Sequence, residues 1–128
     1  MQTFINLPVK DLPKAVEFFS TLGFAFDEQF ADENGTRMIL GDETSVMLVT
    51  EPIFGGFVVP LDVVDTSQAR EVIVGLAADS REHVDEMLHK VVAAGGRELG
   101  EPQDDGFMYM RGFLDLDGHQ WSFIHMAM

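Results

Sequence analysis

Histidine is the side chain best suited to acid–base chemistry and metal binding, and this sequence has four. Asp85 and His89 stand four residues apart, so on a helix they would share a face and could hold one ion. The alternative is a solvated helix face, on which His83 would also lie. His119 falls in a predicted turn. The alternation of the last strand directs His125 toward the helix layer, which favours a hydrogen-bonded structural role.

No side-chain pattern typical of a nucleophilic enzyme is present. The chain has no cysteine, which excludes a thiolate nucleophile, a thiolate metal site and a disulfide. No serine stands beside a histidine at catalytic spacing, and no glycine-rich phosphate loop occurs. On a cleft face the Tyr109 hydroxyl would be the best hydrogen-bond donor or general acid, and the alternative is core packing. Arg111 could orient an anionic ligand or form a surface ion pair.

The first half of the chain predicts one strand, one helix and three further strands. Residues 2–8 form a short strand-like run, and Asp11 is a helix N-cap with Pro13 in the first turn. Gly23 is a typical helix C-terminal residue. The apolar stripe of this helix is Leu12, Ala15, Val16, Phe19 and Leu22, and the strands that follow are 24–30, 37–40 and 45–50.

The second half repeats this order. A strand is predicted at 72–78, and Asp79 or Ser80 can cap the helix that follows. The apolar stripe of that helix is Val84, Met87, Leu88, Val91 and Val92, and the strands after it are 98–101, 107–116 and 120–126. Two βαβββ units, 1–50 and 71–128, therefore form one α+β domain over residues 1–128. A lone unit cannot cover its own curved sheet.

The connector, residues 51–70, contains glycine, proline and aromatic residues. Phe54 and Phe57 flank Gly55 and Gly56. Their rings could form a lid over a ligand, or they could pack onto the sheet or a partner chain.

The element order and several motifs resemble the vicinal-oxygen-chelate superfamily. That group includes glyoxalase I, extradiol dioxygenases, fosfomycin-resistance transferases and bleomycin-binding proteins. The resemblance implies two tandem βαβββ units that form a curled mixed sheet with a cleft and with helices on the outer face. The second helix is similar to lactoylglutathione-lyase-related sequences. The segments that carry the resemblance across the chain are Leu7 to Leu12, Phe18 and Phe19, Leu22 to Phe24, and Phe113 to His119.

The resemblance also implies positions for metal ligands, and here they lack ligating side chains. In metal-dependent members, His, Glu or Gln from the first and last strands of each unit hold one divalent ion, which polarises substrate oxygens. Carried over by motif, these positions are Phe4, about Leu48, about Ile73, and Ser122. A shift of one residue yields only Met47, Val49, Val72 or Val74. We therefore expect no metal and no other cofactor.

If those four positions line a cleft, the cleft is mostly apolar with a few polar neighbours. Asn6 and Gln120 each offer a donor and an acceptor, and Gly75 lets a ligand approach the backbone. Equally, these polar groups could satisfy one another. The expected ligand-binding residues are Phe4, Asn6, Leu48, Thr50, Phe54, Phe57, Ile73, Tyr109, Gln120 and Ser122.

The charge balance narrows the class of partner. With 22 acidic and 8 basic residues the formal charge is −14, which repels nucleic acid and anionic membrane surfaces. It favours cationic ligands, or it only keeps the protein soluble. No basic leader and no apolar run near ~18 residues is present, so we expect a cytoplasmic protein.

Three functional hypotheses follow. The first is a metal-free module that binds a small aromatic or cationic molecule, in the manner of the bleomycin-binding relatives. The alternative is a lyase-like or dioxygenase-like enzyme with a non-metal or displaced-metal mechanism. The third is an assembly-forming scaffold without a ligand. Relatives of this length pair, so a homodimer is expected.

Overall fold

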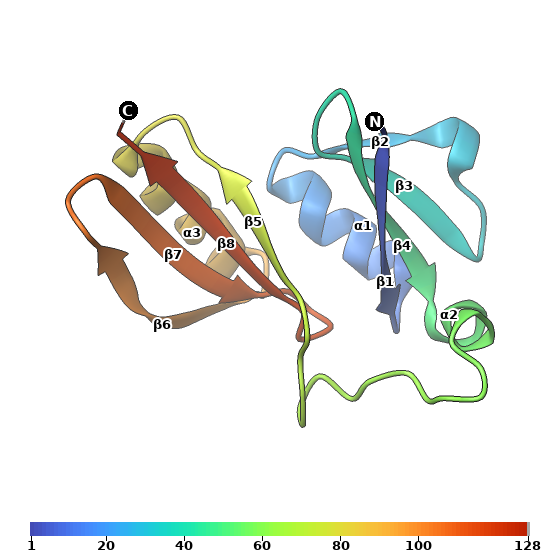
Figure 1. Cartoon of the computed structure of the whole chain (residues 1–128). Coiled ribbons are helices and arrows are strands. Elements are labelled where there is room, and N and C mark those ends of the chain that lie inside the picture. The colour runs from blue at the N-terminus through green and yellow to red at the C-terminus, as the bar shows by residue number, and fades with distance from the viewer. Residues whose placement is uncertain (128) are drawn as a thin grey trace. The chain divides into compact units, whose positions relative to one another are not determined.

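The computed structural model describes residues 1–127 and contains two compact units, Met1–Val64 and Asp65–Met128. Each unit has a four-stranded mixed sheet with a helix in contact with it (Figure 1). The predicted α+β class and the repeated βαβββ order are confirmed, with the strands divided between two four-stranded sheets. Among residues 1–127, no helix is long and apolar enough to span a membrane.

The first unit has the strand order β1-β4-β3-β2. Strand β1 runs parallel to β4, and the other neighbours are antiparallel. Its elements are β1 (Thr3–Val9), α1 (Leu12–Thr21), β2 (Ala25–Asp27), the 3-10 helix η1 (Glu28–Phe30), β3 (Gly35–Ile39), β4 (Thr44–Thr50) and α2 (Glu51–Phe57).

Helix α1 begins and ends where the sequence predicts. The Asp11 carboxylate accepts a hydrogen bond from the Lys14 backbone N–H at 3.1 Å, and Gly23 takes a φ of 102° after the last turn. Phe18 and Phe19 are 2% and 1% exposed and meet edge to face. Burial of each ring contributes about 2–3 kcal/mol. The helix therefore closes the apolar face of its sheet, formed by Leu7, Val9, Met38, Val46 and Leu48.

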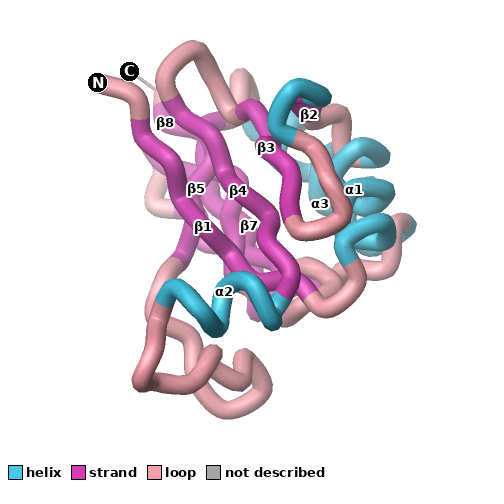
Figure 2. Tube along the Cα trace, turned by 90° about the vertical axis from the view of Figure 1, so that its right-hand side faces the viewer, coloured by secondary structure: helices cyan, strands magenta, loops and turns pink. Residues whose placement is uncertain are grey.

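The structure differs from the sequence prediction in two segments of the first unit, the strand expected at 24–30 and the start of the connector 51–70. The strand expected at 24–30 is only β2, because the Asp27 carboxylate accepts from the Gln29 N–H at 3.0 Å and caps the 3-10 helix η1. The connector opens with a helix, α2, which has Pro52 in its first turn. This helix contacts β1 and β4, and Figure 2 shows it beside an end of these strands.

The second unit has the strand order β5-β8-β7-β6, with β5 parallel to β8. In Figure 1, α3 lies behind β7 and β8, both of which it contacts. The elements are β5 (Ile73–Ala77), α3 (Arg81–Ala93), β6 (Arg97–Asp104), β7 (Met108–Leu114) and β8 (Gln120–Met126).

The core of this unit lies between α3 and its sheet. Ser80 is the N-cap of α3, since its hydroxyl accepts from the His83 N–H at 3.0 Å. The predicted stripe is buried except for Val92, which is 54% exposed. On the sheet, Phe113 stacks on Trp121 and Phe123 with centroids 6.3 and 5.6 Å apart. Each aromatic pair adds about 0.5–1.5 kcal/mol beyond its buried area.

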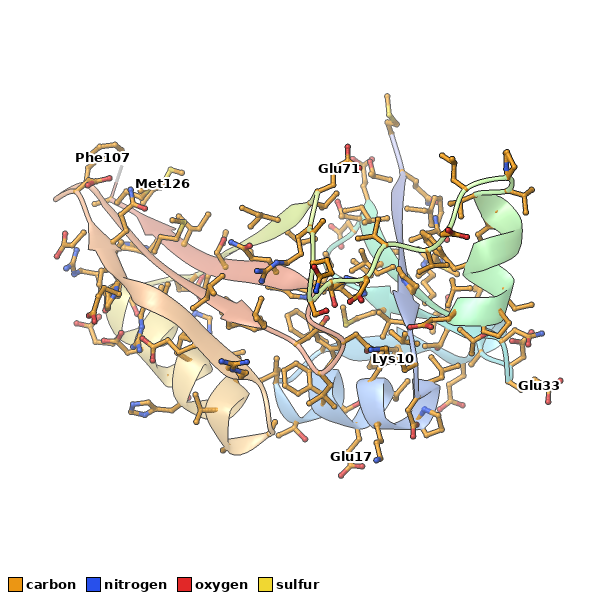
Figure 3. The ribbon with its side chains drawn as sticks, turned by 90° about the horizontal axis from the view of Figure 1, so that it is seen from below. Lys10, Glu17, Glu33, Glu71, Phe107 and Met126 are labelled. Carbon is orange, nitrogen blue, oxygen red and sulfur yellow. The ribbon has the colours of Figure 1, made fainter. Side chains whose placement is uncertain are left out.

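Strand β6 is longer than predicted and irregular. It continues to Asp104 through a register shift between Leu99 and Gln103, so Gln103 and Asp104, expected in the turn between the strands 98–101 and 107–116, are part of the strand. The turn that follows brings Phe107 to the end of β8, where its carbonyl accepts from the Ala127 N–H at 2.7 Å. Figure 3 shows Phe107 and Met126 side by side there.

Candidate functional site

Each sheet has an open face, on the side opposite the face that packs against α1 or α3. In the second unit it includes Ile73, Gly75, Gln120 and Ser122, because Ile73 pairs with Gln120 and Gly75 with Ser122. These are the residues that the sequence placed together. Ser122 is only 4% exposed, and a Cβ on Gly75 would lie 3.5 Å from the Ser122 oxygen and 3.2 Å from the Ile124 Cδ1. Glycine at position 75 therefore keeps space open above the serine.

The turn before β8 holds Gln120 and Ser122 in register. The Asp115 carboxylate accepts from the backbone N–H groups of Asp117 at 2.9 Å and His119 at 3.0 Å, and from the Trp121 indole N–H at 2.9 Å. Its burial raises the pKa of Asp115 above the ordinary carboxyl value, although these bonds and His119 oppose that shift. The buried Asp115 carboxylate therefore holds the turn before β8 together by accepting three hydrogen bonds.

In the first unit the open face includes Phe4 and Asn6 on β1, together with Ser45 and Met47 on β4. The ladder pairs Phe4 with Ser45 and Asn6 with Met47. The sequence placed Leu48 on this face, and that placement is wrong. Leu48 pairs with Leu7, on the face that packs against α1, and is fully buried.

Thr50 has the same parity as Leu48, since it pairs with Val9 rather than with Pro8. Its expected place among the ligand-binding side chains of the open face is therefore wrong as well. The physical reason is register. A one-residue error in a strand moves every side chain to the other face, and apolar residues on both faces of β4 hide that error in the sequence.

The sequence did not single out Arg37, which is the main polar feature of this open face. Its side chain is 20% exposed, and its guanidinium carbon lies 5.4 Å from the centre of the Phe4 ring and 5.6 Å from that of Phe30. The Arg37 Nε donates to the Ser45 hydroxyl at 2.8 Å, and Nη1 lies 3.4 Å from an oxygen of Asp27. We call these five residues the Arg37 cluster.

One signal for Arg37 was available in the sequence. Alternation along β3 puts Gly35, Arg37 and Ile39 on one face, and an arginine in a strand is informative in a chain with only eight basic residues. The contact with Phe30 was not predictable, because it depends on the 3-10 helix η1.

Tyr109 does not join the open face, so its expected place among the ligand-binding side chains is wrong. Its hydroxyl donates to Asp85 on α3 at 2.7 Å, which shows that it points to the helix side of the sheet. This bond, with burial, raises the pKa of Tyr109; the same bond lowers the pKa of Asp85, although burial of Asp85 opposes that shift. The raised pKa makes Tyr109 a poorer acid near neutral pH.

Arg111 is part of the same helix-side network rather than an anion site. Its guanidinium lies 2.8 Å from Asp85 and 2.7 Å from Glu98. Burial works against the charge, but the bonds to these two carboxylates raise the pKa of Arg111 on balance. Arg111 forms ion pairs, as one of the two interpretations from the sequence held, but the side chain is 14% exposed and lies mostly below the surface.

The histidines do not gather into a metal site. His125 Nδ1 lies 3.1 Å from the Ala78 carbonyl, as expected for a structural residue. His83 Nδ1 accepts from the Asp79 N–H at 3.1 Å. Within residues 1–127, no three His, Asp or Glu side chains come close enough together to hold a metal ion.

Phe54 and Phe57 lie on α2, with ring centres 6.3 Å apart. Phe57 is 63% exposed, whereas Phe54 is partly buried. A short helix, rather than a flexible glycine loop, positions these rings. Whether they cover a ligand stays a prediction.

Comparisons with known proteins place this geometry in context. The family model described as the Glyoxalase/Bleomycin resistance protein/Dioxygenase superfamily matches residues 2–123. Among solved structures, the hypothetical protein SA1046 from S. aureus is 29% identical, with 98% of this chain and 93% of that chain covered and a TM-score of 0.85. The search of curated proteins found no match.

Two further structures show the fold alone. A glyoxalase/bleomycin resistance protein/dioxygenase family enzyme from Burkholderia phytofirmans PsJN is 13% identical, with 96% of each chain covered and a TM-score of 0.83. The fosfomycin resistance protein FosX from Listeria monocytogenes is 19% identical, with 98% of this chain and 92% of that chain covered and a TM-score of 0.70.

The metal that such a fold implies does not fit the side chains present. On the open faces, the strand positions nearest the implied ligands carry Phe4, Met47, Ile73 and Ser122. A phenyl ring, a thioether, an alkyl chain and one hydroxyl do not make a donor set for a divalent ion that prefers nitrogen and carboxylate oxygen.

Proposed function

Since the chain belongs to the Glyoxalase/Bleomycin resistance protein/Dioxygenase superfamily, we propose that it binds a small organic molecule on the open faces of its sheets, without a divalent metal at the implied positions. The observation that carries this proposal is the replacement of the ligand set by Phe4, Met47, Ile73 and Ser122. Such a surface favours contact with an organic ligand over coordination of an ion.

The polar groups of the open faces support the binding role. Asn6 is exposed, Gln120 is partly exposed, and neither side chain has a hydrogen-bond partner among the described residues. Each therefore retains an amide donor and a carbonyl acceptor for a ligand. Ile73, 60% exposed, adds apolar surface beside Gln120. Apolar walls with a few polar groups are typical of small-molecule sites.

The class of ligand is inferred from the apolar residues of the open faces and from the net charge of the chain. The apolar residues favour an aromatic or other apolar body, and the charge of −14 raises the local concentration of cationic compounds at low ionic strength. The alternative, a lyase-like or dioxygenase-like enzyme with a displaced metal, lacks a cluster of donors within residues 1–127. The proposal also includes that the protein is cytoplasmic and forms a homodimer, as the resemblance to paired relatives implies.

The test is a ligand screen followed by a matched pair of variants. Aromatic compounds with and without a cationic group are titrated into ¹⁵N-labelled protein, and the shifted amide resonances are mapped. Gln120→Ala should weaken the best compound by about 3- to 10-fold, the value of a neutral hydrogen bond. The control Gln29→Ala removes an exposed glutamine from the 3-10 helix η1 and should change nothing. Equal affinities in the two variants would exclude the open face of the second unit as the site, and no compound that shifts open-face residues of either unit would overturn the proposal.

A further inference from the structure

We propose that the Arg37 cluster is a binding site for the carboxylate group of a small monoanionic ligand with an aromatic or apolar body. The inference rests on the proposed function and keeps its aromatic or apolar ligand body, but at this cluster it assigns the ligand a negative group in place of the cationic group that the net charge favours. It starts from an arginine whose guanidinium donates to Ser45 and Asp27 and lies 5.4 and 5.6 Å from the centres of two phenyl rings. What such an arginine can bind depends on which of its N–H groups remain unpaired.

The hydrogen bonds of Arg37 leave one terminal nitrogen available. Nε donates to Ser45 and Nη1 is engaged by Asp27, but Nη2 has no hydrogen-bond partner among residues 1–127. A guanidinium presents five donors in a rigid plane, so fixing one edge fixes the direction of the others. The free Nη2 donors are thus oriented before a ligand arrives, which reduces the entropy lost on binding.

The two rings supply the apolar part of the site. Phe4 is 48% exposed and Phe30 is 54% exposed, so each residue keeps about half of its surface uncovered. Rings that served only to shield the arginine would gain from burial, whereas these keep apolar area that a ligand can cover. An aromatic body on these rings places its acidic group within reach of Nη2.

The charge of the cluster favours a carboxylate over a phosphate. Asp27 has one oxygen bound to the Gln29 N–H and the other 3.4 Å from Arg37, so it offsets part of the positive charge. A dianion meets about twice the repulsion from Asp27 and twice the attraction to Arg37 that a monoanion meets, so the second charge gains little beside this ion pair and costs more to desolvate. The net charge of the chain attracts cations at long range, whereas the Arg37 cluster attracts an anion at contact distance. Salt screens the long-range attraction, so contact pairs dominate at physiological ionic strength.

The second unit holds a matched control for this arrangement. Arg81 also lies over an aromatic ring, 4.4 Å from the centre of Tyr109, and it is also paired with an aspartate, Asp104. It lies on the helix side of its sheet, since Tyr109 points to α3. Arg81→Gln therefore removes the same kind of contacts without touching an open face.

The experiment uses the full chain, ¹⁵N-labelled, and three probes at fixed ionic strength: benzoate, its uncharged isostere benzamide, and phenylphosphonate. Resonances of the Arg37 side chain and of the Phe4 and Phe30 amides report binding at the cluster. Benzoate should bind about 10-fold or more tightly than benzamide, as expected for a charged hydrogen bond, and more tightly than phenylphosphonate. Arg37→Gln should abolish the preference for benzoate, and Arg81→Gln should preserve it.

A second variant keeps the test decisive if Arg37→Gln fails to fold. Asp27→Asn keeps the shape and the acceptor for Gln29 but removes the competing charge. It should strengthen benzoate binding severalfold and leave benzamide unchanged. No gain in Asp27→Asn, or phenylphosphonate as the tighter probe, would overturn the carboxylate site. Equal binding of benzoate and benzamide at the open face would refute it while leaving the proposed function intact. No binding by any probe at either open face would count against both.

Discussion

Replacement of the buried Asp115 by alanine tests how the site is held in place. This carboxylate is 6% exposed and serves three donors in the turn that leads into β8, which carries Gln120 and Ser122. Asp115→Ala removes every one of these acceptors. The two backbone N–H groups belong to partly exposed residues and can turn to water. The indole N–H of Trp121 cannot, because Trp121 is fully buried.

The expected loss follows from that difference. An unpaired buried donor costs about 1–3 kcal/mol, and removal of a carboxylate of this size leaves a small cavity. One effect acts in the opposite direction. Burial raises the pKa of Asp115, so at neutral pH the folded protein carries a charge that its surroundings disfavour, and alanine relieves this. We expect a net loss of about 1–3 kcal/mol in the free energy of unfolding at pH 7.

Urea denaturation monitored by circular dichroism measures this loss, and Asp32→Ala is the matched control. Asp32 also accepts two backbone N–H bonds in a turn, at 2.8 and 3.1 Å, but the turn is exposed and no buried donor depends on it. Its replacement should cost about 0.5–1 kcal/mol. If Asp115→Ala costs no more than Asp32→Ala, the bond to Trp121 is not what stabilises the turn.

Three further predictions concern the helix side, α2 and assembly. Tyr109→Phe removes the main cause of the lowered pKa of Asp85. The lowered pKa stabilises the folded protein at pH values above the ordinary pKa of 3.8, and this stabilisation is lost as the pH falls through the lower pKa of the folded state. The variant should therefore lose less stability than the wild type between pH 6 and pH 3, and an unchanged pH dependence in urea denaturation would contradict the role given to this bond. Phe57→Ala should change the free energy of unfolding by less than about 0.5 kcal/mol because Phe57 is 63% exposed, so a larger loss would show a stabilising contact beyond its neighbour Phe54. Light scattering at micromolar concentration should give the mass of a dimer, and a monomer mass would refute the expected pairing.

The fold was predictable because local signals agree with one another along the chain. Asp11 and Gly23 bracket a helix whose predicted apolar stripe matches most of its buried face, although Phe18 is also buried and Val16 is only partly buried. The same holds for α3 from Ser80 to Gly95, except for the exposed Val92. The elements that were missed lack such agreement. Helix α2 contains two glycines and follows a strand without a side-chain cap, so nothing in its pattern favours a helix.

The site was predictable only where the strands alternate clearly. In β8, polar Gln120 and Ser122 alternate with aromatic Trp121 and Phe123, so the sequence assigned both faces correctly. In β4, Val46, Leu48 and Val49 are all buried, and the two faces of the strand look alike in the sequence. The Arg37 cluster was missed for another reason, since it joins residues from β1, β3, β4 and the segment around η1 that only the folded sheet brings together.

The central claim is that this family member binds an organic molecule without a divalent ion, and one titration tests it most directly. Protein treated with a chelator and dialysed is titrated with the best aromatic compound, first alone and then after addition of nickel, zinc, manganese or iron. We expect the same affinity in every case, shifts at the open-face residues, and no ion retained at one per chain after a second dialysis. Binding that appears only with a metal, together with one retained ion per chain, would contradict metal-free binding. It would also show that the ion is held by side chains away from the positions of Phe4, Met47, Ile73 and Ser122.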